Sequence, residues 1–253
     1  MKAILPAAGM GSRLGSITKD FPKFILDVHG RSLLERSLDN LERNGVEEAI
    51  IVVGFQKQKI MDELGDSFKG MHIRYAINDF YDSASTAISF YQSRKFINLK
   101  DDIFLAYADL LYEPDAIRFL LEDKSENNML VVPFSGVKNP AYVKMDENDF
   151  LENLVKGEKY KPSVCGETAD IYKLSARFVQ GLYKMIEEEW DYGIKDRFIE
   201  RAILDLSKTI PVKCIKRDVL WIGINTEDAL NRARNEIYHQ IKEKLNSDGQ
   251  EYW

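Results

Sequence analysis

Cysteine and histidine are scarce in this chain, which has two cysteines and three histidines in 253 residues. Two cysteines, Cys165 and Cys214, exclude a disulfide framework and indicate reduced thiols in a cytoplasmic protein. The three histidines are isolated from one another in the sequence, which argues against a zinc site of the clustered kind. They are His29, His72 and His239.

The sequence also lacks long apolar runs and an excess of positive charge. No segment approaches the ~20 apolar residues that a membrane-spanning helix needs, and no signal peptide is evident. The formal net charge of −6 argues against a nucleic-acid binder that works through bulk charge. We therefore expect a cytoplasmic protein without membrane or nucleic-acid partners.

What is present is the composition of an ordinary globular protein. The chain is 45% hydrophobic and long enough to bury a sizeable core as one domain. No internal repeat, low-complexity tract or clear linker interrupts it. We predict one domain over residues 1–246, followed by a frayed tail over residues 247–253.

The first half of the sequence alternates between strand and helix patterns. Residues 49–53 form a continuous apolar run, as in a strand covered on both faces. Residues 31–44 place leucines on one helical face, and Gly45 follows as a helix stop. The alternation predicts an α/β fold with one doubly wound, mixed but mostly parallel sheet. The other elements expected in this half are strands at 2–7, 72–77 and 103–108 and helices at 57–64, 85–96 and 114–121.

The second half changes to short strands interspersed with longer helices. We interpret the inserted strands as a lid on the acceptor side of the domain. Residues 156–164 are polar and predict a loop. The expected strands are at 128–134, 142–145, 150–155, 168–174, 210–215 and 219–224, and the expected helices are at 175–189, 196–206 and 226–246.

The segment after the first strand is rich in glycine and small residues. Gly9 and Gly11 let the backbone approach a polyphosphate, and N–H groups in such a turn form an anion cradle. Arg13 and Lys23 add two cations at its rim. The spacing does not fit a P-loop, and Leu14 stands where a dinucleotide fingerprint needs its third glycine. The segment therefore predicts a site for a nucleoside triphosphate.

These residues resemble the signature of the nucleotidyltransferases that make sugar nucleotides and CDP-alcohols. Its two correctly spaced halves are Leu5-Pro6-Ala7-Ala8-Gly9-Met10-Gly11-Ser12-Arg13-Leu14 and Thr18-Lys19-Asp20-Phe21-Pro22-Lys23. The resemblance covers nearly the whole chain and implies a Rossmann-like, GT-A-like nucleotidyltransferase fold. It implies that Arg13 and Lys23 bind phosphates of the two substrates as catalytic residues. The loop would hold the triphosphate through Leu5, Ala7, Ala8, Gly9, Met10, Gly11 and Ser12.

Asp109 is the candidate ligand for Mg²⁺, the expected cofactor. It ends the predicted strand at 103–108, and ligands bind at the carboxyl ends of strands in open α/β sheets. In the resembled family, an aspartate at the matching position binds the metal. We therefore count Asp109 as both a catalytic and a metal-binding residue.

The second carboxylate of the family's metal site is missing here. The family pattern is Trp-x-Asp-x-(Gly/Asp)-Thr, whereas residues 221–226 read Trp-Ile-Gly-Ile-Asn-Thr, with Gly223 in place of the carboxylate. Three outcomes stay open: Mg²⁺ held by one carboxylate and the triphosphate, a substitute carboxylate at Asp218 or Asp170, or weakened or lost activity. Asn225 could serve as a neutral oxygen ligand.

A further resemblance concerns the nucleotide base. Asn78-Asp79-Phe80-Tyr81, followed by Ser85-Thr86-Ala87-Ile88-Ser89, resembles a segment of the cytidylyltransferases for phosphocholine, aminoalkyl phosphonates and related small phosphates. Hydroxyls at a helix start suit a pyrimidine edge or a ribose, so Ser85 and Thr86 are candidates for the base. Asn78 and Tyr107 complete the expected nucleotide site.

The acceptor site is expected on the strand at 166–172, which resembles the acceptor-side strand of the family. A carboxylate there could meet a cationic amine or a sugar hydroxyl, and a lysine could face the acceptor phosphate. Aromatic rings could wall an ammonium pocket through cation–π contact, from Tyr142, Trp190 and Trp221. The candidate acceptor residues are Lys144, Glu167, Asp170 and Trp221.

We therefore expect an enzyme that moves CMP from CTP to a small phosphate or phosphonate and releases pyrophosphate. Acceptors of the phosphocholine, aminoalkyl phosphonate or amino-acid phosphate type, used for cell-surface or capsule decoration, fit this interpretation. Two alternatives stay open. One is a sugar-1-phosphate nucleotidyltransferase that uses UTP, dTTP or GTP, and the other is a non-catalytic nucleotide-binding regulator. A homodimer is compatible with each.

Overall fold

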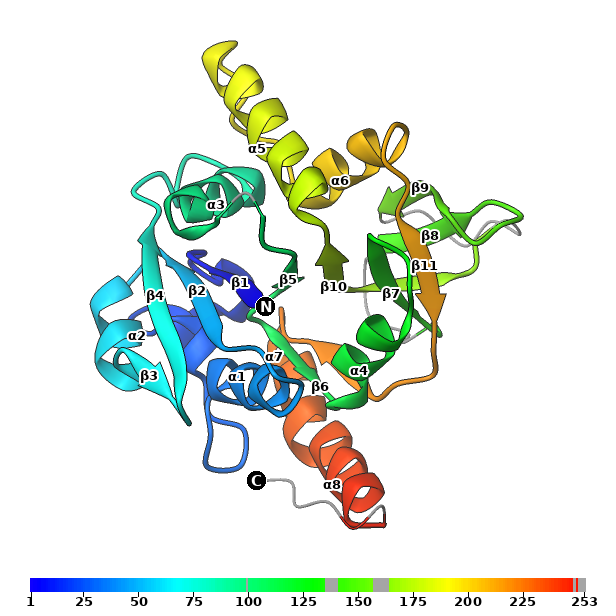
Figure 1. Cartoon of the computed structure of the whole chain (residues 1–253). Coiled ribbons are helices and arrows are strands. Elements are labelled where there is room, and N and C mark those ends of the chain that lie inside the picture. The colour runs from blue at the N-terminus through cyan, green and yellow to red at the C-terminus, as the bar shows by residue number, and fades with distance from the viewer. Residues whose placement is uncertain (99, 135–140, 157–163, 248, 250–253) are drawn as a thin grey trace.

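A computed structural model describes residues 1–98, 100–134, 141–156, 164–247 and 249. Within these residues, ten strands form one mixed sheet (Figure 1). Eight strands follow one another across the sheet, and a hairpin of two more strands is attached to one of them. The strand order is β11 (Lys213–Lys216), β7 (Asn128–Val132), β10 (Gly166–Leu174), β5 (Ile103–Ala106), β1 (Lys2–Ala7), β2 (Glu48–Val53), β4 (Met71–Ile77) and β3 (Ser67–Phe68). The hairpin consists of β8 (Ala141–Met145) and β9 (Leu151–Lys156), and β8 pairs with β10.

The centre of the sheet is parallel, which confirms the expected fold class. Strand β1 pairs in parallel with β2 and β5, and β2 with β4. Strand β10 runs antiparallel to β5 and β7, so the second half of the chain makes the sheet mixed. Residues 49–53 are fully buried, as the continuous apolar run predicts for a strand covered on both faces.

Helices cover both faces of the sheet. One core joins the sheet to α1 (Leu33–Arg43), α2 (Lys57–Leu64) and α4 (Asp115–Glu122). The other joins it to α3 (Thr86–Gln92), α5 (Ala176–Asp191) and α6 (Ile199–Ser207). Figure 1 shows these two groups on opposite sides of the sheet, with α5 projecting from the body of the molecule.

A small ribbon beside the main sheet positions the functional region. Strand β6 (Leu110–Tyr112) pairs antiparallel with β12 (Trp221–Gly223). A third apolar core joins this ribbon to α7 (Glu227–Arg232), a π-helical turn (Ala233–Ile237) and α8 (Tyr238–Ser247). The long helix expected at 226–246 is therefore present, with one π turn inside it. The strand expected at 103–108 ends instead at Ala106, and the chain turns at Asp109 into a strand that the sequence analysis did not predict.

Helix ends follow their local sequence signals. Ser32 and Glu35 form a capping box on α1, and Ser175 accepts a hydrogen bond from the Phe178 N–H at the start of α5. Thr226 caps α7 in the same way through the Ala229 N–H. Most of the loop expected at 156–164 and of the tail expected at 247–253 lies outside the described residues; Lys156 ends β9 and Ser247 ends α8.

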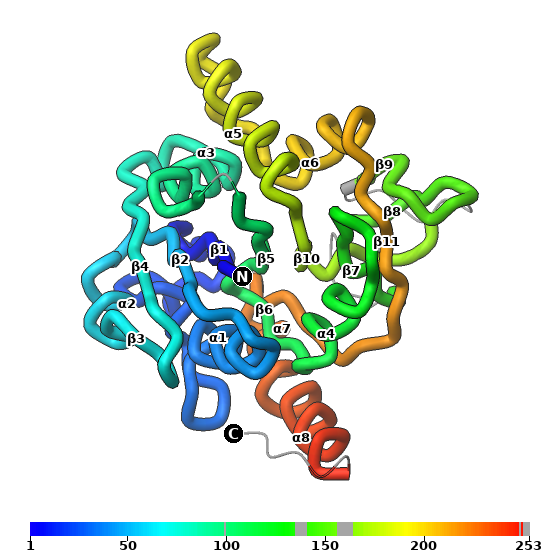
Figure 2. The backbone as a smooth tube through the Cα atoms, in the orientation of Figure 1, coloured from blue at the N-terminus to red at the C-terminus, as the bar shows by residue number. Residues whose placement is uncertain are grey.

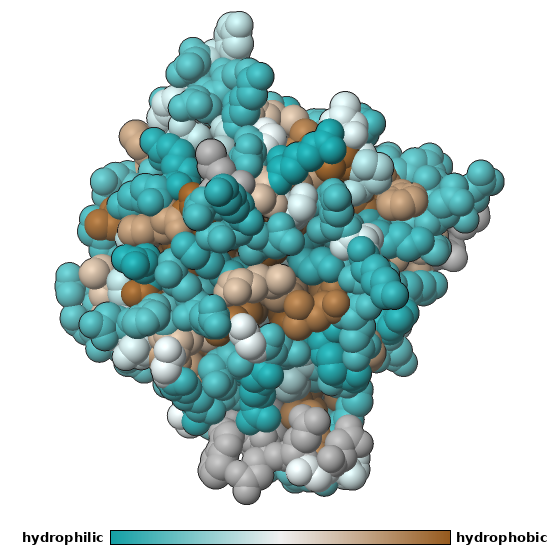
Figure 3. Space-filling view, viewed as in Figure 1, coloured by the Kyte–Doolittle hydropathy of each residue, from teal (hydrophilic) through white to brown (hydrophobic). Residues whose placement is uncertain are grey.

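Both hydrophilic and apolar residues are visible on the surface of the molecule. The face in Figure 3 is mainly hydrophilic, and its apolar residues gather in interrupted patches near the middle. None of the helices in the described ranges has the length and apolar character that crossing a membrane requires.

Candidate active site

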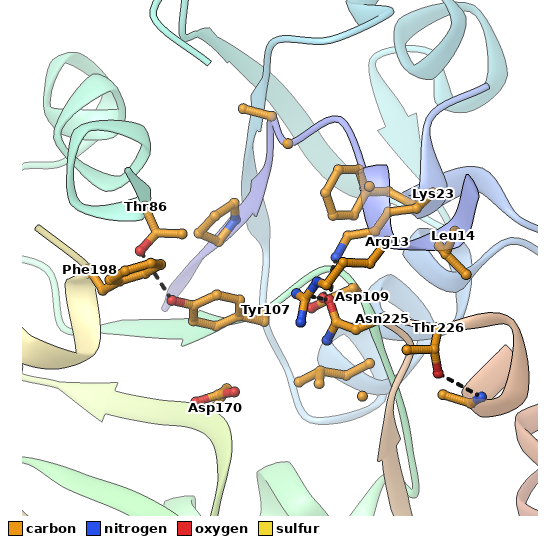
Figure 4. A pocket seen from close by; sticks show the side chains of 18 of the residues that line it. Arg13, Leu14, Lys23, Thr86, Tyr107, Asp109, Asp170, Phe198, Asn225 and Thr226 are labelled. Atoms are coloured by element: carbon orange, nitrogen blue, oxygen red, sulfur yellow. Dashed lines mark hydrogen bonds and ion pairs between the residues drawn. The ribbon is translucent and has the colours of Figure 1, made fainter. Parts of the chain in front are cut away.

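A cavity of about 730 Å³ lies where the loop after β1, the start of α3 and the turn before β6 meet β10, the start of α6 and β12. Figure 4 shows that its side chains fall into two groups on either side of Tyr107. Arg13, Lys23, Asp109 and Asn225 lie together in one group. Thr86, Phe198 and Asp170 lie at the other end, so the cavity has two chemically different halves.

The loop after β1 is built around two glycines that line the cavity. Gly11 has φ +66°, and a Cβ there would lie 3.2 Å from Lys23 Cβ and 3.3 Å from Thr18 Cγ2. Its carbonyl accepts hydrogen bonds from the Leu14 N–H (2.9 Å) and the Thr18 hydroxyl (2.8 Å). Gly9 has no neighbouring atom within 4 Å of such a Cβ, so its backbone faces open space. Gly9 leaves room for a ligand beside the loop, as the predicted phosphate cradle requires, whereas Gly11 lets Lys23 and Thr18 pack closely against the loop.

Four residues of the predicted nucleotide and metal site converge beside this loop. Lys23 Nζ lies 2.5 Å from Asp109 Oδ2, and the two side chains are only 10% and 9% exposed. Asn225 Oδ1 accepts hydrogen bonds from Lys23 Nζ at 3.1 Å and from Arg13 Nη2 at 2.6 Å. Two cations, one carboxylate and one amide therefore form a compact cluster with a net positive charge.

The β6–β12 ribbon explains why these residues meet. Gly223 pairs with Leu110, and the Ile224 N–H donates to the Asp109 carbonyl at 2.8 Å. This places residues 109 and 225 on neighbouring strand ends, although 116 positions separate them in the chain. Gly223 itself lines the cavity. A Cβ there would meet only ordinary van der Waals contacts, the nearest being Leu110 Cδ2 at 3.7 Å.

The structure narrows the alternatives for a metal ligand. Asp218 is exposed and is not among the residues that line the cavity, and Asp170 lies beyond Tyr107 from Asp109 (Figure 4). In the described part of the chain, no group of three or more His, Cys, Asp or Glu residues could hold a metal ion. Asp109 and Asn225 thus offer one carboxylate and one amide oxygen. Mg²⁺ in such sites takes its remaining ligands from phosphates and water.

The second half of the cavity is aromatic and acidic. The Tyr107 hydroxyl donates to Thr86 Oγ1 at 3.4 Å, and Thr86 Oγ1 accepts from the Ile199 N–H at 3.0 Å. Burial raises the pKa of Tyr107 well above its usual value, and the nearby charges of Glu200 and Asp170 raise it further. Tyr107 therefore stays a neutral hydroxyl between the two halves.

Asp170 reaches the cavity through an irregularity in β10. Its φ is +56°, and the register of β10 on β7 shifts between Thr168 and Tyr172. The Asp170 N–H donates to Thr168 Oγ1 at 3.0 Å, and the Asp170 carbonyl accepts from the Tyr107 N–H at 3.2 Å. Bulges of this kind redirect side chains and recur beside active sites.

Several predicted site residues lie elsewhere. Glu167 is 1% exposed and is not among the lining residues, because side chains alternate along a strand and Thr168 and Asp170 take the cavity side. Lys144 pairs with Glu152 on the β8–β9 hairpin, Nζ to Oε1 at 2.5 Å, and is not a lining residue.

Of the other residues predicted for the nucleotide site, some line the cavity and some do not. Leu5 and Ala7 are fully buried in β1, and Met10 is 43% exposed; none of them lines the cavity. Asn78 is also buried, and its Nδ2 donates to Ser89 Oγ at 2.9 Å, so it supports a lining residue. The predicted residues that do line the cavity are Ala8, Gly9, Gly11, Ser12, Arg13, Lys23, Ser85, Thr86, Tyr107, Asp109, Asp170, Trp221 and Asn225.

The two other predicted aromatic walls also lie away from the cavity. Tyr142 packs edge to face against Phe134, with ring centroids 5.9 Å apart. Trp190 packs against Phe80 at 4.9 Å and under the Lys195 ammonium. Neither is a lining residue, which leaves Trp221 as the predicted aromatic that reaches the cavity.

Sequence reasoning missed Glu200 and Phe198, which enter the cavity from the start of α6. Glu200 Oε2 is buried and has no hydrogen-bond partner among the residues that the structure describes. A polar and aromatic helix start at 196–200 was the only local signal. The packing of α6 against the start of α3, which places these residues, joins segments over 100 positions apart.

Comparisons with known proteins place this geometry in a family. Residues 3–183 match the model of the MobA-like NTP transferase domain. A CMP-5'-(3-aminopropyl)phosphonate synthase of Streptomyces rubellomurinus is 26% identical over 76% of this chain and 31% of its own length. A CTP:phosphoglutamine cytidylyltransferase of Campylobacter jejuni is 27% identical over 78% of this chain and 83% of its own.

A solved structure confirms the fold. The inositol-1-phosphate CTP transferase from T. maritima superposes with a TM-score of 0.76 at 22% identity, covering 96% of each chain.

The first relative above is much longer than the matched region, since the alignment spans about a third of it. The family match covers well over half of this chain and agrees with the predicted resemblance to nucleotidyltransferases. The chain belongs to the family with the MobA-like NTP transferase domain.

Proposed function

We propose that this protein transfers CMP from CTP to a small phosphate or phosphonate that carries a cationic amine, with release of pyrophosphate. The observation that carries the proposal is the division of one cavity into a cationic half beside the glycine loop and an acidic, aromatic half (Figure 4). A triphosphate suits the first half, and an amine suits the second.

The cationic half supplies what a triphosphate needs. Loop N–H groups and the guanidinium of Arg13 can hold phosphate oxygens, and Lys23 supplies a mobile point charge. Asp109 is the one carboxylate of this cluster, so the cluster keeps a net positive charge. At the other end of the cavity, next to Thr86, Ser85 Oγ is buried with no hydrogen-bond partner in the described ranges, and we assign this hydroxyl to the base or ribose.

The reaction needs no general base. An oxygen of the acceptor phosphate or phosphonate is already anionic and attacks the α-phosphorus of CTP. The bond from the α-phosphorus to the oxygen that bridges to the β-phosphate breaks, and its electron pair leaves on pyrophosphate. Lys23 and Arg13 stabilise the charge that grows on the departing oxygens. The contribution of the chain is therefore positioning and electrostatic stabilisation.

Mg²⁺ is the metal that we propose for this site. Asp109 would hold it, with Asn225 as a neutral oxygen ligand and the triphosphate completing the coordination. When bound, the ion offsets negative charge at the α-phosphate.

The acceptor half has the features of an amine site. Asp170 and Glu200 supply two carboxylates, and a buried oxygen of Glu200 lacks a partner within the described structure. Phe198, Tyr107 and Trp221 supply aromatic surface to the same cavity. An ammonium group is stabilised by both kinds of contact. The names of the two relatives also describe cytidylyl chemistry on nitrogen-bearing compounds, an aminopropyl phosphonate and phosphoglutamine.

Pyrophosphate release tests the proposal. The protein is incubated with Mg²⁺ and each of CTP, UTP, dTTP and GTP, against phosphocholine, 2-aminoethylphosphonate, amino-acid phosphates and sugar-1-phosphates. We expect release with CTP and an amine-bearing acceptor. Release with UTP, dTTP or GTP and a sugar-1-phosphate would instead show that the protein is a sugar-1-phosphate nucleotidyltransferase. Nucleotide binding without release for any pair would favour the regulator.

A further inference from the structure

The Asp109 carboxylate already has a cationic partner within the chain. Lys23 Nζ lies 2.5 Å from Asp109 Oδ2, inside a region where both side chains are about nine-tenths shielded from solvent. Coulomb attraction between such shielded charges is several times stronger than between exposed ones. A divalent cation that approaches Asp109 must therefore compete with the Lys23 ammonium.

The amide oxygen of Asn225, the other candidate metal ligand, also has cationic partners within the chain. Asn225 Oδ1 accepts from both Lys23 and Arg13, at 3.1 and 2.6 Å. A bare Mg²⁺ at this place would meet one carboxylate, one amide oxygen and two positive side chains. The charges that the chain brings together here thus repel a metal ion as long as the two cations stay in place.

Position 223 is where a second carboxylate could offset the positive charges of Lys23 and Arg13. Gly223 lines the cavity next to Asn225, and a Cβ at 223 would lie 3.8 Å from Asn225 Nδ2. The nearest other atoms, Leu110 Cδ2 and Trp221 Cζ3, are 3.7 and 3.8 Å away. A side chain therefore fits at this position, and its absence leaves Asp109 as the one carboxylate of the cluster.

We propose, building on the function given above, that Lys23 is the resident counter-ion of Asp109 and that the chain takes up its divalent metal only together with the nucleotide. The triphosphate gives Lys23 and Arg13 new anionic partners and brings oxygen ligands of its own. Asp109 and Asn225 are then released to the metal. Because coupling between two ligands is reciprocal, the metal must also tighten nucleotide binding by the same factor.

Manganese binding tests this coupling without any turnover. Free Mn²⁺ is followed by electron paramagnetic resonance for the protein alone, for the protein with the non-cleavable analogue α,β-methylene-CTP, and for the analogue alone, so that Mn²⁺ held by the analogue in solution is subtracted. We expect Mn²⁺ to bind the wild-type protein at least about 100-fold more weakly without the analogue than with it. Stoichiometric wild-type binding of Mn²⁺ that the analogue does not tighten would overturn the proposal.

Two substitutions at position 223 assign the effect to charge. Gly223→Asp adds the missing carboxylate and should tighten nucleotide-free Mn²⁺ binding by at least about tenfold over wild type. Gly223→Asn adds a side chain of the same size without charge and should leave nucleotide-free binding weak. Equal Mn²⁺ affinities for the aspartate and asparagine variants would contradict the role given to this position.

Lys23→Gln provides an independent arm if a variant at position 223 fails to fold. Removing the resident cation should make nucleotide-free Mn²⁺ binding measurable, and an unchanged affinity would contradict the counter-ion role. The outcome is separable from that of the proposed reaction. A wild-type protein that binds Mn²⁺ without nucleotide yet releases pyrophosphate keeps its function and loses only this coupling. The reverse result, coupled binding without transfer, keeps the coupling and loses the function.

Discussion

The ammonium of Lys23 and the carboxylate of Asp109 are in direct contact, although 85 residues lie between them in the chain. The roles expected for both residues came from their place in two short motifs. The contact between them could not be predicted, because it depends on how the turn at Asp109 and the segment that carries Lys23 are placed relative to each other in the fold. The same holds for Asn225. The sequence shows that an asparagine at this position departs from the family pattern, but it does not predict the two hydrogen bonds that Asn225 accepts from Arg13 and Lys23.

Lys23→Ala tests the residue on which most of the reaction depends. We expect turnover to fall by about 10²–10³-fold, because one preorganised cation at the departing oxygens is lost. Pyrophosphate release under saturating CTP measures the effect. Lys19→Ala removes an exposed lysine four residues away and serves as the matched control. A folded Lys23→Ala protein with an unimpaired rate would rule out this role.

Gly11→Ala tests the conformation of the glycine loop. The substituted residue would keep φ +66° and press its Cβ to 3.2 Å from Lys23 Cβ. We expect the free energy of unfolding to fall by about 1–3 kcal/mol, as measured by urea denaturation. Gly9→Ala is the control, since its Cβ would meet no atom within 4 Å, and its stability should stay within about 0.5 kcal/mol. Equal losses for the two variants would argue against the strained position.

At the scale of elements, the sequence predicts what local patterns control. The alternation of strand and helix through the first half and the buried run at 49–53 are confirmed, and Ser175 and Thr226 cap α5 and α7 as their residue types favour. Strand β6 was missed because it has three residues and its partner, β12, comes more than 100 positions later. Glu167 and Asp170 share one strand; side-chain alternation turns Glu167 away from the cavity, and the irregularity in β10 lies at Asp170, which lines it. Long-range pairing of short segments carries no local signal.

Helix α1 carries a buried carboxylate that makes stability depend on pH. Asp39 has a side chain only 4% exposed, with Arg43 Nε at 2.8 Å and with Lys69 as a further partner. Burial raises the pKa of Asp39, but hydrogen bonds from Lys69 and Arg43 outweigh burial and hold the pKa below its usual 3.8. This contribution to stability is present above pH ~4 and is lost as the pH falls through the lowered pKa.

Asp39→Asn should therefore lower the free energy of unfolding at pH 7 by about 1–3 kcal/mol. The variant should also lose less of its remaining stability than wild type between pH 5 and about 3. Urea denaturation across that range measures both effects. Asp62→Asn, at an exposed carboxylate of α2, is the control. A variant that keeps the wild-type pH dependence would show that the Asp39 cluster does not control it.

At the scale of the whole molecule, the cavity is assembled from parts of the chain that lie far apart in sequence: the loop after β1, the start of α3, the turn before β6, β10, the start of α6 and the segment from β12 to α7. Figure 2 shows β1, β5 and β10 near the middle of the molecule, with α3 and α6 beside one another above them. The nucleotide half depends on the first of these parts, which is why its chemistry was visible in the sequence. The acceptor half depends on how α6 packs against α3, which only the folded chain reveals.

The measurement that tests the central claim most directly is discrimination for the acceptor amine. With CTP and Mg²⁺, kcat/KM is compared for the best amine-bearing acceptor and for its analogue with hydrogen in place of the amine, in wild type and in the double variant Asp170→Asn and Glu200→Gln. We predict that wild type prefers the amine by at least about 100-fold and that the double variant loses most of this preference. Equal use of the two acceptors by wild type, or a preference that the double variant keeps, would contradict an acidic half built to bind a cation.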